Sequence, residues 1–135
     1  YKDNKSQIDT NIRHIKGSRK NIHLALSISD ALLSLSNKRP EGFGLTMLEA
    51  MSHGVPIIAC KHGGALDLVN DNLNGFLYEP GSNEDFAKKL QIFLEMNQEN
   101  RSRMRAAALS HSKKFSSEVT IQKLIRIYQN LSSPK

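Results

Sequence analysis

Apolar residues in this chain occur in short blocks with two kinds of spacing, and polar turns separate the blocks. Where apolar residues follow one another with little interruption, the pattern is typical of a strand buried on both faces of a parallel sheet. Turn residues support this interpretation, since Asn74 and Gly75 precede one block and Pro80 and Gly81 follow it. The predicted strands are residues 11–16, 31–36, 55–60 and 76–79.

Other apolar residues recur at helical spacing, as do Leu45, Leu48 and Met51. Ser82 or Asn83 can cap one helix, and Gly54 can end another. Because strands alternate with helices, the sequence predicts an α/β fold with a parallel sheet. The predicted helices are residues 19–29, 45–53, 65–70, 83–96, 99–110 and 117–131.

Parallel sheets of this kind bind ligands at the carboxyl ends of their strands. The loops to consider are therefore those that follow the predicted strands. They are residues 36–44, 60–64 and 80–82.

Length and composition fit a single globular domain over residues 1–135, because 39% hydrophobic and 24% charged residues exclude a disordered segment. Cys60 is the single cysteine, so the chain can form neither an internal disulfide nor a cysteine-based metal site, and a cytoplasmic setting is expected. No apolar run approaches the roughly 20 residues that a membrane-spanning helix needs. The chain begins with Tyr1, which suggests a piece of a longer protein.

The formal net charge of +6 comes entirely from the end of the chain. Residues 101–135 contain eight Lys or Arg and one acid, whereas the first hundred residues are close to neutral. No aromatic residues alternate with these charges as they would in a single-strand-binding surface, so nucleic acid is not expected as a partner. A solvated helix face, contact with another domain and attraction to anionic lipid all remain open.

The segment 39–51 carries the residues best suited to binding chemistry, because it joins a predicted strand to a predicted helix. Gly42 and Gly44 allow the backbone to approach a ligand closely. The amides of Gly44, Leu45 and Thr46 at the helix start form an anion site that the helix dipole strengthens. The loop therefore suits a phosphate.

Two carboxylates flank this loop, since Glu41 precedes the helix and Glu49 lies about one turn inside it. Carboxylates accept bidentate hydrogen bonds from vicinal hydroxyls, so a phosphate between two such groups describes a nucleotide-sugar. A plain capping interaction with an exposed helix glutamate explains the same spacing. The apolar neighbours Leu48 and Ala50 favour a crowded Glu49 that needs a partner.

These residues resemble the C-terminal nucleotide-binding domain of retaining glycosyltransferases of the GT-B fold, family 4 type. The shared signature is a pair of glutamates separated by seven residues, here Glu41 and Glu49. The resemblance implies a Rossmann-like parallel sheet flanked by helices, with a helical C-terminal tail. It extends from Ser29 to Pro80 and includes 54–59, Gly63, Gly64 and 74–78.

The resemblance also implies roles for individual residues. Glu41 is the implied catalytic residue, which contacts the donor sugar and stabilises charge at the reacting carbon, and Glu49 holds the ribose hydroxyls. Backbone amides at the start of the helix bind the sugar hydroxyls and the diphosphate. The implied substrate-binding set is Glu41, Gly42, Phe43, Gly44, Leu45, Thr46 and Glu49, with Ile15, Lys16 and Gly17 at the nucleobase.

The implied activity is transfer of a hexose from a UDP- or GDP-sugar to a glycan or glycolipid, as in polysaccharide, lipopolysaccharide or capsule synthesis. No metal and no cofactor are expected. In the family, a basic pair that neutralises the diphosphate lies earlier in this domain, and the acceptor site lies in a separate N-terminal domain. Neither is in this chain, so the chain alone is expected to be inactive.

The last helix of the family typically crosses back toward the N-terminal domain. The basic tail therefore has two implied partners, which are that missing domain and the anionic inner face of a membrane, where the protein would be peripheral.

The alternative function is a non-catalytic nucleotide-binding or interaction domain of the same fold. An epimerase of related architecture would not be expected to carry Glu41 and Glu49 in this arrangement. The five histidines lack ligand-like spacing, and only His62 lies in a candidate binding loop. Cys60 is interpreted as a small buried apolar residue.

Overall fold

The structure, a computed structural model, describes residues 17–36 and 42–132. Within these residues, a parallel sheet contains the strands β1 (Leu32–Ser34), β2 (Ile57–Cys60) and β3 (Gly75–Tyr78), in that spatial order. Ile58 in the central strand pairs with Leu33 of β1 and with Phe76 of β3. Because the strands are parallel, their carboxyl ends lie at the same edge of the sheet.

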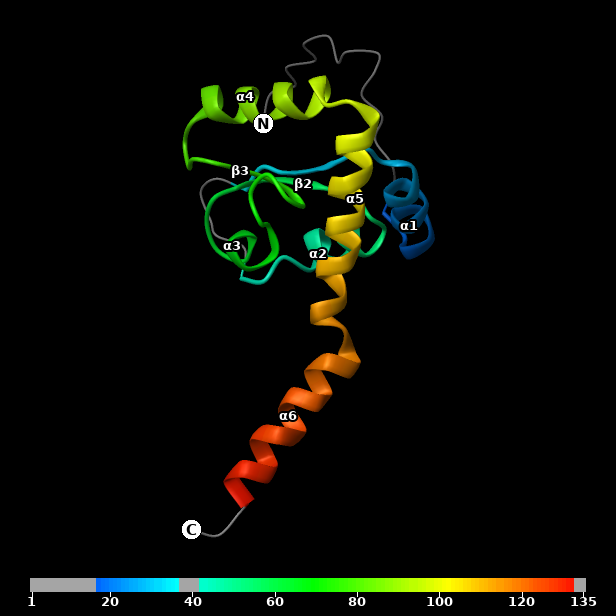
Figure 1. The fold of residues 1–135 in the computed structure, drawn as a ribbon, viewed down its shortest axis with the longest axis vertical. Coiled ribbons are helices and arrows are strands. Elements are labelled where there is room, and N and C mark those ends of the chain that lie inside the picture. Colours follow the sequence, from blue (N-terminus) through cyan, green and yellow to red (C-terminus); the bar gives the residue numbers. More distant parts are fainter. Residues whose placement is uncertain (1–16, 37–41, 133–135) are drawn as a thin grey trace, which may run out of the picture.

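Helices connect the strands and surround the sheet (Figure 1). The α/β architecture with a parallel sheet is therefore confirmed, and the strand predicted at 11–16 lies outside the described residues. The short 3-10 helix η1 was not expected from the sequence. The helices are α1 (Arg19–Ile28), α2 (Leu45–Ser52), α3 (Ala65–Leu68), α4 (Asn83–Glu95), α5 (Gln98–Ser112), η1 (Lys113–Phe115) and α6 (Ser117–Ser132).

Local sequence explains where the longer helices begin and end. The side chain of Ser82 accepts a hydrogen bond from the amide of Asp85 and caps α4. Of the two predicted caps, Ser82 and Asn83, it is therefore Ser82 that is confirmed. Asn97 caps α5 in the same way. Gly54 follows α2 with a φ of 68°, a left-handed conformation that glycine adopts without steric cost.

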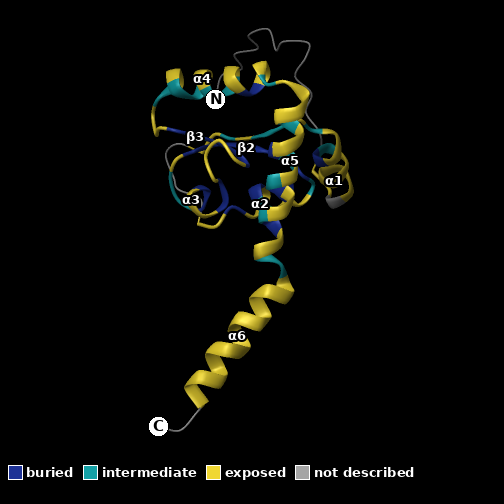
Figure 2. Cartoon of the chain, in the orientation of Figure 1, coloured by how far each residue is buried: buried dark blue, intermediate teal, exposed yellow. Residues whose placement is uncertain are grey.

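The central strand β2 is buried on both faces, as its apolar sequence predicts. Ile57 and Ala59 pack into one cluster with α2 and α3, whereas Ile58 and Cys60 pack into another with β3 and α4. This alternation follows from the two-residue period of a strand. The sheet is thus held between two apolar layers, and Figure 2 shows the buried strands at its centre.

The outer edge of β3 is protected by side chains. The amide of Leu77 donates to Asp71 Oδ1 at 2.9 Å, and the amide of Glu79 donates to Asp85 Oδ2 at 2.8 Å. These carboxylates occupy donors that an added strand would use. β3 is therefore a closed edge of the sheet.

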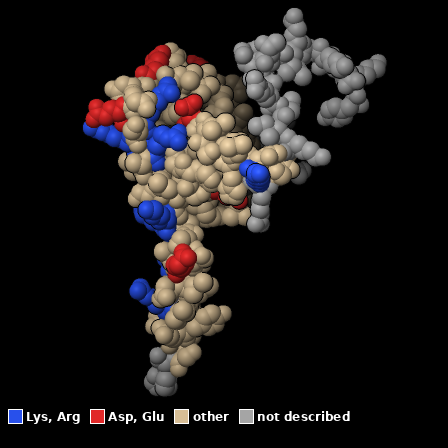
Figure 3. Space-filling view, turned by 90° about the vertical axis from the view of Figure 1, so that its right-hand side faces the viewer, with Lys and Arg blue, Asp and Glu red and all other residues tan. Residues whose placement is uncertain are grey.

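Helix α6 leaves the body of the molecule and has no buried residue (Figures 1 and 2). Its apolar side chains include Tyr128 and Leu131, which are 68% and 77% exposed. Figure 3 shows Lys and Arg side chains where this helix leaves the body and along its length. Among the described residues, no helix has the length and apolar character that crossing a membrane would require.

Candidate functional site

The carboxyl ends of β1 and β2 meet the amino end of α2 at one edge of the sheet. β1 ends at Ser34 and β2 at Cys60, and α2 begins at Leu45. Ligands of open α/β sheets bind in the crevice outside these strand ends. The predicted binding loop therefore lies where the fold favours a ligand site.

The amino end of α2 leaves its first amides free to bind an anion. Gly44 precedes the helix with a φ of 85°, and no side chain among the described residues caps this end. The first bond of the helix runs from the amide of Leu48 to the carbonyl of Gly44 at 3.0 Å. The amides of Leu45, Thr46 and Met47 thus have no intrahelical acceptor, and the helix dipole favours negative charge in front of them.

Phe43 ties this loop to two other parts of the molecule. A Cβ atom on Gly64 would overlap the backbone carbonyl of Phe43, so the 61–64 loop packs directly against the 42–44 loop. The Phe43 ring makes an edge contact with Phe115 of η1, with a centroid separation of 5.5 Å. These contacts fix the backbone in front of α2, which pre-organises the free amides.

Glu49 lies on the exposed face of α2. The expectation that apolar neighbours crowd this carboxylate is wrong, because Glu49 is exposed although its neighbour Ala50 is fully buried. Leu45 and Glu49 are four residues apart and share one face, so Glu49 lies about 6 Å along the helix from its amino end. A ligand whose phosphate lies at Leu45 can extend along this face to the carboxylate.

The structure brings together six residues of the predicted set. Glu41, Ile15 and Lys16 lie outside the described residues. Gly17 is exposed just before α1. The six are Gly42, Phe43 and Gly44 in the loop, and Leu45, Thr46 and Glu49 in α2.

His62 adds a polar side chain to this edge of the sheet. The sequence indicated only that His62 lies in a candidate binding loop. Its ring lines a small cavity of about 10 Å³ together with Ser34, Ser36 and Met47. Both ring nitrogens are shielded from solvent and lack a hydrogen-bond partner among the described residues. The position of His62 directly after a buried strand was the available signal.

Lys61, the neighbour of His62, does not line this cavity and pairs with a carboxylate. Its Nζ lies 2.8 Å from Glu79 Oε1, and this carboxylate raises the pKa of the lysine. The pair is about half exposed, so its contribution to stability is small.

Cys60 and Tyr78 lie side by side at the ends of β2 and β3. Burial raises the pKa of the Cys60 thiol and that of the Tyr78 hydroxyl. Cys60 is 2% exposed, which confirms its interpretation as a small buried residue and argues against a reactive thiolate.

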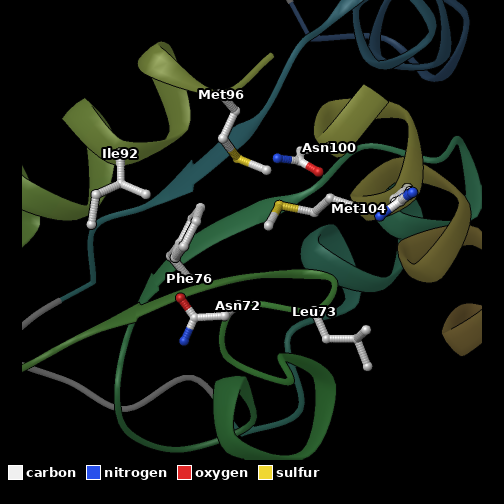
Figure 4. A pocket seen from close by; sticks show the side chains of 8 residues that line it. Asn72, Leu73, Phe76, Ile92, Met96, Asn100 and Met104 are labelled. Atoms are coloured by element: carbon white, nitrogen blue, oxygen red, sulfur yellow. The ribbon is translucent and has the colours of Figure 1, made fainter. Parts of the chain in front are cut away.

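A larger cavity of about 430 Å³ lies near the amino end of β3, between α4 and α5 (Figure 4). Phe76, Met96 and Met104 point into it, with Asn72 and Asn100 as polar groups at its side. None of the predicted substrate-binding residues lines this cavity. It is separate from the site at the strand ends.

A family model described as "Glycosyl transferases group 1" matches residues 3–111. The match covers most of the chain, so the chain belongs to this family of glycosyltransferases. The resemblance drawn from the sequence is confirmed for glycosyl transferases of group 1 and for the GT-B fold, whereas retention of configuration and the family 4 type stay predictions.

Individual relatives agree with this assignment. The solved structure of Anabaena HepE in complex with UDP-glucose has a TM-score of 0.68 and 31% identity, and the match covers 84% of this chain and 30% of that one. N-acetyl-alpha-D-glucosaminyl L-malate synthase of Bacillus anthracis is 32% identical over 115 residues, which are 85% of this chain and 30% of that protein. Sucrose synthase of Melioribacter roseus is 46% identical over 54 residues, or 40% of this chain and 7% of that enzyme. The chain thus spans less than a third of these relatives.

Proposed function

We propose that this chain is the donor-binding domain of a retaining hexosyltransferase, which transfers a sugar from a nucleotide-sugar to a glycan or glycolipid. The observation that carries the proposal is the amino end of α2, which no side chain of residues 17–36 or 42–132 caps and which lies beside the carboxyl ends of β1 and β2. A solved relative with 31% identity holds UDP-glucose, which supports a ligand of this class.

In this proposal the amides of Leu45 and Thr46 bind the diphosphate, and those of Phe43 and Gly44 bind sugar hydroxyls. Glu49 accepts hydrogen bonds from the ribose, since its carboxylate shares the exposed face of α2 with Leu45. Glu41 contacts the transferred sugar and stabilises positive charge at the reacting carbon. Ile15, Lys16 and Gly17 contact the nucleobase.

The chemical step places negative charge on the departing nucleoside diphosphate. Backbone amides that are already oriented toward this charge stabilise it without reorganisation. The proposed reaction therefore needs no metal ion, and transfer by the longer protein should persist in excess EDTA. Loss of activity in EDTA, with recovery on adding Mg²⁺, would contradict this part of the proposal.

The direct test is calorimetric titration of the purified chain with UDP-glucose, UDP, GDP and uridine. Binding of a nucleoside diphosphate without binding of uridine is expected, because the free amides of α2 recognise the phosphates. Glu49→Ala should weaken UDP binding by about tenfold through loss of the ribose contact. Equal affinity for uridine and UDP would exclude the site at α2.

Catalysis is proposed to require a longer protein, because the family resemblance implies an acceptor site in a separate N-terminal domain and a basic pair earlier in this domain. Purified residues 1–135 should bind the donor and show no transfer to an acceptor. Transferase turnover by this chain alone would overturn that statement.

The second candidate is a non-catalytic interaction domain, and the exposed apolar face of α6 favours it. Under both readings we propose that α6 packs against a partner, either another part of a longer cytoplasmic protein or an anionic membrane face. Vesicles of phosphatidylglycerol distinguish the two partners. Salt-sensitive cosedimentation that Lys113→Ala and Lys114→Ala abolish would support the membrane, and its absence would support the protein partner.

A further inference from the structure

The side chain of His62 is held in a defined place at the end of β2. The amide of His62 donates to the carbonyl of Cys60 at 2.8 Å, which turns the chain sharply after the strand. Gly63 follows with a φ of 54°, and Gly64 packs on the backbone of Phe43. These turns hold the backbone of His62 beside the start of α2.

The surroundings of the His62 imidazole provide no hydrogen-bond partner for its nitrogens among the described residues. Neither nitrogen is accessible to solvent, and neither has a hydrogen-bond partner among the described residues. Buried polar groups nearly always have such partners, because a buried donor or acceptor without a hydrogen bond lowers the stability of the folded state. An unsatisfied histidine at the carboxyl edge of a parallel sheet therefore suggests a missing ligand atom.

The cavity beside the ring limits what that ligand atom can be. Its volume is about 10 Å³, which is room for about one water molecule. Besides His62, its wall consists of Ser34 and Ser36 at the end of β1, Met47 of α2, Cys60 of β2 and Ala65 of α3. A single oxygen fits, whereas a sugar ring or a nucleobase does not.

We propose that the His62 imidazole hydrogen-bonds one oxygen of the donor's sugar diphosphate. This inference rests on the proposed function, because it places the oxygen next to the amides of α2. Met47 links the two features, since it is the third residue of α2 and also lines the cavity. The oxygen belongs either to the phosphate that carries the sugar or to a hydroxyl of that sugar.

A neutral imidazole has one donor and one acceptor nitrogen, so it can donate to either kind of oxygen. The two sources are distinguished by titrating the chain with UDP and with UDP-glucose. His62→Leu should raise the Kd by about tenfold, and His62→Asn should retain much of the affinity because it keeps a donor. His23→Leu is the matched control, because His23 is an exposed histidine on α1.

Equal weakening of UDP and UDP-glucose by His62→Leu would assign the oxygen to the phosphate. Weakening of UDP-glucose alone would assign it to the sugar. Unchanged affinity for both ligands would overturn the proposal while leaving the proposed function intact. Absence of binding by the unsubstituted chain would overturn the proposed function and this inference with it.

Thermal unfolding without ligand provides the second measurement. Because neither ring nitrogen has a partner in the described part of the chain, His62→Leu should leave the Tm of the unliganded chain unchanged or raise it. A Tm that falls in His62→Leu and recovers in His62→Asn would show a structural hydrogen bond. That result would overturn the proposal independently of donor binding.

Discussion

Gly64 joins the two loops of the candidate site through direct backbone contact. An alanine there would place its Cβ against the carbonyl of Phe43, and neither backbone can move without shifting the start of α2. Gly64→Ala should therefore lower the free energy of unfolding by about 1–3 kcal/mol, measured by urea denaturation. Gly42→Ala is the control, because a Cβ on Gly42 meets no atom within 4 Å. Equal stabilities of the two variants would contradict the packing of these loops.

The raised pKa values of Cys60 and Tyr78 determine how the stability of the chain should change at alkaline pH. Their pKa values lie above the ordinary 9.0 and 10.0, chiefly because of burial. The unfolded chain then releases these protons at lower pH than the folded chain, so stability is complete below pH 9 and falls as the pH rises further. Urea midpoints at pH 7, 9 and 10.5 measure this fall, and Cys60→Ala should reduce it.

The same burial predicts slow alkylation of Cys60. At pH 8 iodoacetamide should modify the folded chain much more slowly than the chain in 8 M urea, since the thiolate is disfavoured and shielded. Equal rates in the two conditions would contradict the placement of this thiol.

At the scale of the elements, the closed edge of β3 depends on two carboxylates. Asp85→Ala removes the acceptor for the amide of Glu79 and should cost about 1 kcal/mol of unfolding free energy. Asp85→Asn keeps an acceptor oxygen and should cost less. Glu84→Ala is the control from the same helical turn, because Glu84 is exposed. Urea denaturation compares the three variants, and an equal loss in all of them would contradict the edge contact.

Helix α6 is expected to contribute little to the stability of the body. None of its residues is buried, so removal of residues 117–135 should shift the Tm by less than about 4 °C. Removal should also reduce binding of a hydrophobic dye, since it takes away exposed apolar surface. A loss of cooperative unfolding in the shortened chain would show that α6 supports the core.

For the molecule as a whole, the elements with a strong local pattern were predictable from the sequence. The apolar run at 55–60 gave β2, and Ser82 marked the start of α4 through its cap. Residues 113–115 carried no periodic pattern, so η1 could not be anticipated. The helix at 117–131 was predicted from its spacing, but such spacing does not reveal whether anything covers the apolar side chains, and the structure leaves those of α6 exposed.

The candidate site was predictable to the extent that it depends on local backbone geometry. The position of Gly44 before the helix and the start of the helix were predictable from the spacing of glycines and apolar residues, because both belong to the strand-to-helix turn. The surroundings of Glu49 and His62 depend on which helix face packs inward and on which loops meet. Neighbours in sequence do not decide this, and the expected crowding of Glu49 was wrong for that reason.

The central claim is that a nucleotide-sugar binds at the amino end of α2. NMR titration of the ¹⁵N-labelled chain with UDP-glucose locates the ligand directly. The largest amide shifts are expected at Gly44, Leu45 and Thr46, with little change at Asn72 and Met96 in the separate cavity. Shifts confined to that cavity or to α6, with the α2 amides unmoved, would contradict this claim.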